Sequence, residues 1–170
     1  MQGDSLTLDP HAQNEGPTTQ VSRQVYEALV QRGLDMKIGP ALAKSWKATD
    51  PNTWIFTLRE DVKFSDGSAM TSNDVVFSVL RAKQRTSDFK EYISTISGVE
   101  AIGDYSVKII TSKPNPILLN QLSNIFIMSK AWSEKNFAMS PQNWDAGQET
   151  FSATNALGTG PFKITLREPN

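Results

Sequence analysis

The residue types that carry most enzyme chemistry are scarce in this chain. His11 is its one histidine and there is no cysteine, which excludes thiolate nucleophiles and disulfides. A Ser-His-Asp arrangement would have to be built around His11, whose loop has no nucleophile-elbow sequence. The acidic residues mostly stand singly, which favours solvated surface charge over a metal site. We therefore expect no catalytic residues, no metal ligands and no cofactor.

The triplet Gly158, Thr159 and Gly160 resembles part of a phosphate-cradling loop. No lysine and helix follow it in the required pattern, and Pro161 comes next instead. We interpret the triplet as a tight turn that enters a strand.

The loop before the first predicted helix has a different character. Asn14, Glu15, Gly16 and Thr18 combine an amide, an acid, a glycine that allows close backbone approach and a helix start. Because helix N-termini attract carboxylates and phosphates, these residues are candidates for holding the polar end of a ligand. An ordinary capped loop explains the same residues equally well.

Two helices are predicted from spacing and capping. After Pro17, the chain places apolar or aromatic residues at helical spacing, with Thr18 or Thr19 as the cap: Val21, Val25, Tyr26 and Leu29. Residues 71–74 (TSND) offer a hydroxyl at the N-cap and an acid three residues later, followed by an apolar face, which predicts a helix over about 72–85. A tight turn at residues 65–68 (SDGS) precedes it.

Two β-hairpins are predicted from alternation of apolar and polar residues. Residues 53–59 alternate, and the alternation resumes at residues 62–64, which predicts the first hairpin. Residues 99–102 and 105–109, separated by a turn at Gly103, predict the second.

The remaining pattern is a mixture of short elements. It predicts strands at 5–8, 125–128 and 162–166, helices at 116–122 and from about Lys130, and irregular structure over 140–160. Strands and helices intermingle without an internal repeat, so the predicted class is α/β (mixed α+β).

Charge and hydropathy bound the partners. The 170 residues include 17 basic and 18 acidic side chains, so no strong field draws the chain to nucleic acid. No stretch approaches the roughly 18 apolar residues of a membrane span, and residues 1–4 lack the features of a signal peptide. If the natural protein is exported, we expect its signal to be absent from this chain.

An ordered series of motifs runs along the whole chain. It comprises residues 7–11 (TLDPH), 26–30 (YEALV), 40–46 (PALAKSW), 54–59 (WIFTLR), 62–67 (VKFSDG), 71–78 (TSNDVVFS), 99–102 (VEAI), 104–109 (DYSVKI), 127–130 (IMSK) and 158–162 (GTGPF). This series resembles bacterial extracellular solute-binding protein family 5, the dipeptide, oligopeptide and nickel type of ABC transporter substrate-binding protein. The chain departs from the family pattern at Ala28, where glycine is usual, and at Asp61 and Ser65. None of these positions touches a known chemical step.

The resemblance implies a periplasmic-binding-protein type II-like fold in a two-lobed protein much longer than this chain. We expect the chain to be a truncated N-terminal fragment. Residues 1–40 would be the N-terminal segment of the first lobe, 41–155 its extra α/β subdomain, and 156–170 the return strand into the first lobe.

The resemblance also implies the function. The whole protein would be the periplasmic substrate-binding component of an ABC importer, capturing a peptide or a similar small solute and delivering it to a membrane permease. In such proteins the loop after the first strand and the later Gly-Thr-Gly-Pro stretch lie close to the ligand cleft. The expected ligand-binding residues are Asn14, Glu15, Gly16 and Thr18, followed by Gly158 and Thr159.

Three alternatives remain open from the residues. The fragment is ligand-incompetent because half of the cleft is missing, or it self-associates through truncated surfaces. The third, a peptide hydrolase, is disfavoured by the single histidine and the absence of cysteine.

Overall fold

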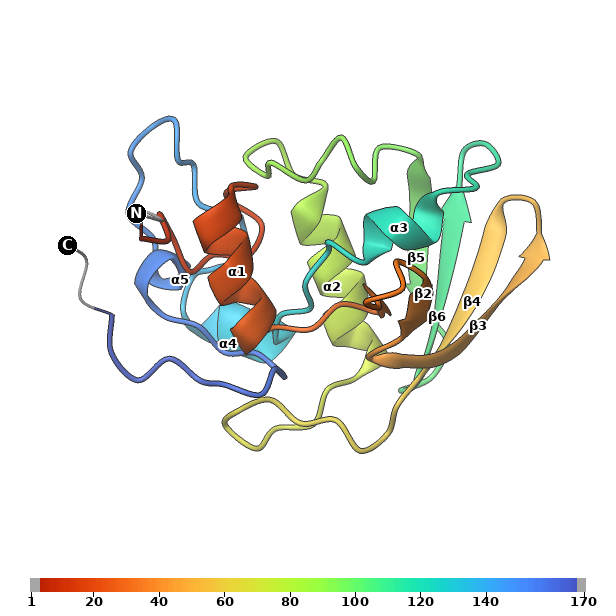
Figure 1. The fold of residues 1–170 in the computed structure, drawn as a ribbon, viewed down its shortest axis with the longest axis horizontal. Helices are drawn as coiled ribbons and strands as arrows, with labels where there is room; N and C mark the ends of the chain where they lie inside the picture. Colours follow the sequence, from red (N-terminus) through yellow and green to blue (C-terminus); the bar gives the residue numbers. More distant parts are fainter. Residues whose placement is uncertain (1–3, 168–170) are drawn as a thin grey trace.

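The computed structural model describes residues 4–167, and its largest element is an antiparallel sheet of four strands (Figure 1). The strands are β3 (Ala43–Asp50), β4 (Thr53–Leu58), β5 (Ile96–Ala101) and β6 (Ser106–Thr111), in the order β3-β4-β6-β5. The two central strands alternate as a half-buried sheet requires, burying Phe56, Leu58, Val107 and Ile109.

The first hairpin was predicted with the wrong partner strand. β4 pairs with β3, with Trp46 opposite Phe56, and residues 62–64 form no strand of this sheet. β3 is an edge strand whose residues are mostly exposed, so it lacks the apolar alternation by which a strand is recognised. Val62 and Phe64 are nevertheless buried, and both belong to the main hydrophobic core.

The second hairpin is confirmed. β5 and β6 pair through the turn at Gly103, whose φ of 63° lies in the left-handed region that glycine adopts without strain. The turn at residues 65–68 is confirmed as well, with Gly67 at φ 90° and its N–H donating to the Phe64 carbonyl.

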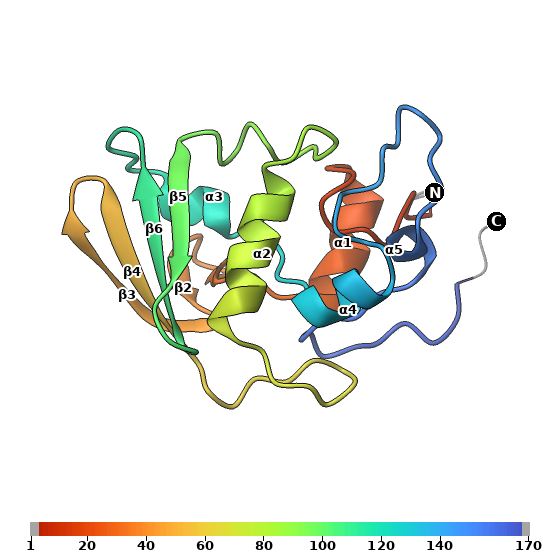
Figure 2. The ribbon, with the colours of Figure 1, turned by 180° about the vertical axis from the view of Figure 1, so that it is seen from behind.

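Helix α2 (Ser72–Ala82) packs against β5 and β6, as Figure 2 shows from behind. The predicted cap is confirmed, because Thr71 is the N-cap and the Asp74 carboxylate accepts its N–H at 2.8 Å. The helix buries Val75, Val79 and Ala82 against the sheet and ends three residues earlier than predicted.

Helix α1 (Gly16–Val25) lies beside α2 on the side away from the sheet (Figures 1 and 2). Its predicted cap was wrong, because Glu15 is the N-cap and its carboxylate accepts the Thr18 N–H at 2.8 Å. The helix also ends at Val25, and Tyr26 and Leu29 are buried from an extended segment.

Short elements complete the described part of the chain. They are β1 (Val30–Arg32), β2 (Ile38–Pro40), α3 (Leu118–Leu122), α4 (Lys130–Lys135) and α5 (Phe151–Thr154). α3 and α4 confirm the two predicted short helices.

The three remaining predicted strands are wrong. Residues 5–8 and 162–166 join no ladder, and residues 125–128 make only an isolated bridge between Phe126 and Ala28. The apolar run at 125–128 is buried as a connector between helices, which a short apolar run does not distinguish from a buried strand. No helix within residues 4–167 is long and apolar enough to cross a membrane.

Candidate functional site

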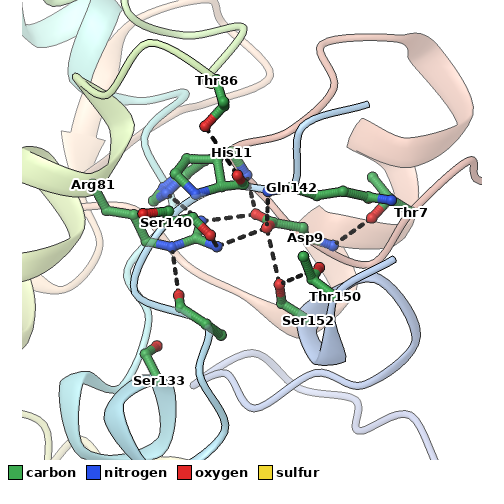
Figure 3. Close-up of polar contacts among 12 residues, drawn as sticks. Thr7, Asp9, His11, Arg81, Thr86, Ser133, Ser140, Gln142, Thr150 and Ser152 are labelled. Carbon is green, nitrogen blue, oxygen red and sulfur yellow. Dashed lines mark hydrogen bonds and ion pairs between the residues drawn. The ribbon is translucent and has the colours of Figure 1, made fainter. Parts of the chain in front are cut away.

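A buried ion pair between Asp9 and Arg81 ties the N-terminal loop to α2 (Figure 3). Both side chains have no exposed surface, and the two guanidinium nitrogens meet the two carboxylate oxygens at 2.8 and 2.6 Å. The carboxylate also accepts from the N–H of Gln142 and from the Ser152 hydroxyl, both at 3.0 Å. The Arg81 guanidinium donates its other N–H groups to the carbonyls of Ala138 and Ser140 and to the His11 ring.

These contacts fix the protonation of His11. Arginine only donates, so His11 Nδ1 is the acceptor at 3.1 Å, and Nε2 carries the proton and donates to the Phe126 carbonyl at 2.9 Å. Burial and the Arg81 charge lower the pKa of His11 to about 3. Burial alone would raise the pKa of Asp9, but Arg81 outweighs it and holds that pKa at about 2.

The cluster is therefore closed to substrates. His11 is fully buried and both of its ring nitrogens are engaged within the protein, so nothing bound at the surface reaches it. The cluster instead joins the N-terminal loop, α2 and residues 138–152. Within residues 4–167, no three His, Cys, Asp or Glu side chains converge as a metal site would need.

The predicted ligand residues of the first loop lie at the N-terminus of α1 and are occupied within the protein. The Glu15 carboxylate fills the position at the helix N-terminus that an anionic ligand would take. The Asn14 amide donates to the Tyr92 hydroxyl at 3.0 Å, and the buried Thr18 hydroxyl accepts the Leu6 N–H at 3.0 Å. Gly16 is exposed.

Gly158 and Thr159 lie at the other end of the same helix. A side chain at Gly158 would collide with the Val25 carbonyl, and the Gly160 N–H donates to that carbonyl at 2.9 Å. The Thr159 hydroxyl is buried and has no hydrogen-bond partner among the described residues. Because a helix of 10 residues spans about 15 Å, the two predicted groups are not brought together in one site.

A polar pocket of about 240 Å³ opens where α1 ends. Its wall is made by the segment after α1, the β1–β2 hairpin and the end of α3, and comprises Arg23, Tyr26, Glu27, Ala28, Val30, Gln31, Arg32, Ala41, Ser123 and Phe126. The buried Tyr26, Ala28 and Phe126 form its apolar base. Tyr26 also touches the position where a Gly158 side chain would stand, so the Gly-Thr-Gly turn supports this pocket from behind.

Two guanidinium groups are held at this pocket by side-chain amides of α3 and of the turn that follows it. Arg32 donates to Asn120 at 2.8 Å, and Arg23 donates to Asn124 at 3.2 Å and lies over the Phe126 ring, 5.9 Å from its centroid. Asn120 lies in α3 and Asn124 in the turn after it, where the Asn124 amide donates to the Asn120 carbonyl at 3.1 Å. The half-buried Glu27 lines the same wall. We name Arg23, Glu27 and Arg32 the charged triad.

The charged triad can hold a small molecule that carries both charges. Guanidinium groups form strong charge-assisted hydrogen bonds with carboxylates, and a carboxylate does so with an ammonium group. Sequence reasoning missed these residues as a site, although Glu27 stands in the motif at residues 26–30 on which the resemblance depends. The amides that orient the arginines are 88 and 101 residues away along the chain, so no local pattern reveals them.

Comparison with known proteins agrees with this architecture. Residues 37–170 match the family described as bacterial extracellular solute-binding proteins, family 5 Middle. The chain is 32% identical to the periplasmic oligopeptide-binding protein OppA of Escherichia coli K12 over 129 residues, covering 65% of this chain and 24% of OppA. It is 30% identical over 167 residues to the probable D,D-dipeptide-binding periplasmic protein DdpA of the same organism, covering 95% of this chain and 31% of DdpA.

A solved structure shows the same fold. The chain superposes with a TM-score of 0.85 and 29% identity on AgaA from Agrobacterium tumefaciens R10, solved in complex with agropinic acid, covering 98% of this chain and 32% of AgaA. The chain thus spans between a quarter and a third of the length of these proteins. A match over most of the sequence and a common fold lead to one conclusion: the chain belongs to family 5 of the bacterial extracellular solute-binding proteins.

Proposed function

We propose that this chain is part of the substrate-binding component of an ABC importer, which captures peptides or similar small solutes outside the cytoplasmic membrane and hands them to a permease. The observation that carries the proposal is the family match over residues 37–170. Relatives described as binding oligopeptides and D,D-dipeptides support a peptide ligand. Binding needs no covalent step, which agrees with a His11 that is closed to substrates.

The charged triad is the part of this chain that we assign to ligand binding. A peptide carries an ammonium group at one end and a carboxylate at the other, which complement Glu27 and the two arginines respectively. The pocket volume of about 240 Å³ lies just below the usual range of about 300–1,000 Å³ for small-molecule sites. It therefore suits one end of a peptide, with the remaining contacts made by parts of the protein outside this chain.

The proposal includes closure of the whole protein around its ligand. A ligand that contacts two lobes stabilises the closed arrangement and shifts the population toward it. Gly158 and Thr159 would support the wall of the cleft from behind Tyr26. Asn14, Glu15, Gly16 and Thr18 remain predicted ligand residues, and their internal hydrogen bonds mean that a ligand would have to compete for them.

Self-association is the second candidate, and a specific surface favours it. Four large apolar side chains near the two ends of the described chain are between 43% and 73% exposed: Leu6, Phe151, Phe162 and Leu166. Apolar surface of this kind marks contacts with other protein surfaces. The sheet also leaves β3 and β5 as unpaired edges.

Native mass spectrometry after incubation with a tripeptide mixture tests the proposal. A monomer carrying one tripeptide mass supports solute binding, and we expect that adduct to weaken in Glu27→Gln and Arg32→Gln but not in Lys47→Gln, an exposed control on β3. A bare monomer would mean that this part of the protein does not bind alone. Dimers that grow with concentration would favour self-association, and tripeptide cleavage lost in His11→Gln would revive the hydrolase.

A further inference from the structure

A second and larger cavity lies at the end of the molecule that carries α5. Its volume is about 610 Å³, within the range of small-molecule sites. Figures 1 and 2 show that the loop before α5, α5 itself and the first described residues lie together at this end, away from the β3–β4 turn. The cavity shares no residue with the pocket at the charged triad. It is lined by Leu6, Gln142, Trp144, Gly147, Gln148, Glu149, Thr150, Ala153, Thr154 and Arg167.

The one cation of this wall, Arg167, already uses its N–H donors within the protein. The Arg167 guanidinium donates to the carbonyls of Ala153, Ser5 and Leu6 at 2.7, 2.6 and 3.0 Å. The anion of the wall is unpaired within the described residues. Glu149 is exposed, and no ion pair or hydrogen bond within residues 4–167 engages its carboxylate. Arg167 keeps its charge, but its N–H donors are used, so the charged group left free to pair with a ligand is the Glu149 carboxylate.

The hydroxyl protons beside the cavity point away from it. Asp9 holds the charged form of its carboxyl, so the Ser152 hydroxyl must donate to it at 3.0 Å (Figure 3). The Thr150 hydroxyl, 3.1 Å from Ser152, is then the donor of that pair. Its oxygen keeps free lone pairs, so Thr150 presents an acceptor to the cavity.

Trp144 adds a further acceptor of positive charge, beside the buried Gln142. Gln142 is only 6% exposed, its Nε2 donates to the Gln148 carbonyl at 2.7 Å, and no donor within residues 4–167 reaches its buried Oε1. That oxygen has no surface open to the cavity, so a ligand there does not reach it. Trp144 is 37% exposed, and an indole face attracts cations.

We propose that this cavity is a binding site for an organic cation, a primary ammonium or guanidinium group carried on an apolar body. The Glu149 carboxylate, the Thr150 oxygen and the Trp144 ring receive the charged group. Leu6 and Ala153 receive the apolar body. The site does not depend on the proposed function, because it uses none of the residues of the charged triad.

Titration with 2-phenylethylammonium tests the site. Binding is followed through the indole N–H resonances of the four tryptophans in ¹⁵N-labelled protein. Phenylacetate, of similar size and opposite charge, is the matched probe, and Trp144→Phe assigns the Trp144 resonance. We expect a saturable shift of that resonance with the ammonium probe and at least about fivefold weaker binding of phenylacetate. Glu149→Gln should weaken the ammonium probe about three- to fivefold, less so at high salt.

The controls separate this site from the peptide site. Glu91→Gln removes an exposed carboxylate that lines neither cavity, and it should leave the affinity unchanged. Glu27→Gln should also leave the ammonium probe unaffected. Equal affinity for the two probes, the absence of a saturable Trp144 shift, or an affinity insensitive to Glu149→Gln would overturn the proposal.

Discussion

Arg81 is a charged side chain with no exposed surface, and its position depends on complete hydrogen bonding. All five N–H donors of a guanidinium are used here, by Asp9, His11, Ala138 and Ser140. Buried ions are tolerated when their charges are paired and their remaining donors satisfied. The cluster therefore joins four separate segments of chain at one point.

Removing one partner of this pair should be strongly destabilising. Asp9→Asn leaves the Arg81 charge buried without its counter-ion, so we expect the free energy of unfolding to fall by about 3–5 kcal/mol. Urea unfolding measures this change as a lower midpoint at an unchanged slope. The matched control is Asp61→Asn, which removes an exposed partner of Arg59 and should change little. Equal effects of the two variants would contradict the assigned role of Asp9.

The same cluster predicts how stability depends on pH. The unfolded chain binds a proton at His11 near its ordinary pKa of 6.5, whereas the folded chain does so only near pKa 3. Stability should therefore fall as pH drops from 6.5 toward 3, by up to about 1.4 kcal/mol per pH unit from this group. The depressed pKa of Asp9 adds a loss in the same direction between 3.8 and about 2.

The slope of the free energy of unfolding against pH, between pH 6 and 4.5, reports on His11, because it is the only histidine. His11→Gln should flatten that slope in a series of urea unfolding curves, whatever its effect on absolute stability. A slope that is the same in the variant would show that His11 does not titrate as this environment requires.

Local signals explain why some residues were predictable. Thr71 and Asp74 are three positions apart, so their capping arrangement is written in four consecutive residues. Asp9 and Arg81 are 72 residues apart, and the sequence contains no sign of their pairing. The charged triad follows the same rule, since its arginines are oriented by distant asparagines.

At the scale of elements, the Gly-Thr-Gly turn is held against the end of α1. The Gly160 N–H donates to Val25 and the Phe162 N–H to Gln24, so the turn takes up carbonyls at the C-terminus of the helix. The turn was predicted here, but the strand after it was not found. Residues 162–166 instead run as an exposed segment without a ladder partner in residues 4–167.

This close approach predicts a strict requirement for glycine at position 158. In Gly158→Ala the new Cβ would collide with the Val25 carbonyl, a backbone atom that cannot move without shifting the end of α1. We expect a loss of about 1–3 kcal/mol in the free energy of unfolding. Gly39→Ala is the control, since nothing lies within 4 Å of its Cβ, and it should change stability by less than about 0.5 kcal/mol. Equal midpoints for the two variants in urea would contradict the packing.

Strand predictions succeeded where alternation was strong and failed where it was weak. β4 and β6 alternate clearly because they are central strands with one buried face. β3 is an exposed edge, and its pairing with β4 replaced the hairpin predicted with residues 62–64. The predicted mixed fold class is unaffected by this error, because it depends on the kinds of elements present rather than on their partners.

At the scale of the whole molecule, the family was identified from ordered motifs, whereas the proposed site was recognised only from the structure. The chain covers between 24% and 32% of the three known proteins compared with it, so it presents only part of their binding surface. The charged triad is the part whose chemistry complements the two ends of a peptide. Recognition of those two ends by this chain is therefore the property to test.

Isothermal titration of the chain with trialanine, N-acetyl-trialanine and trialanine amide tests this claim most directly. We predict that blocking either end weakens binding, that Glu27→Gln removes the penalty for acetylation, and that Arg32→Gln removes the penalty for amidation. Each penalty should remain in Lys47→Gln, whose side chain lies outside the pocket. If the three peptides bind equally, or if the variants leave both penalties intact, the charged triad is not where this protein reads its ligand.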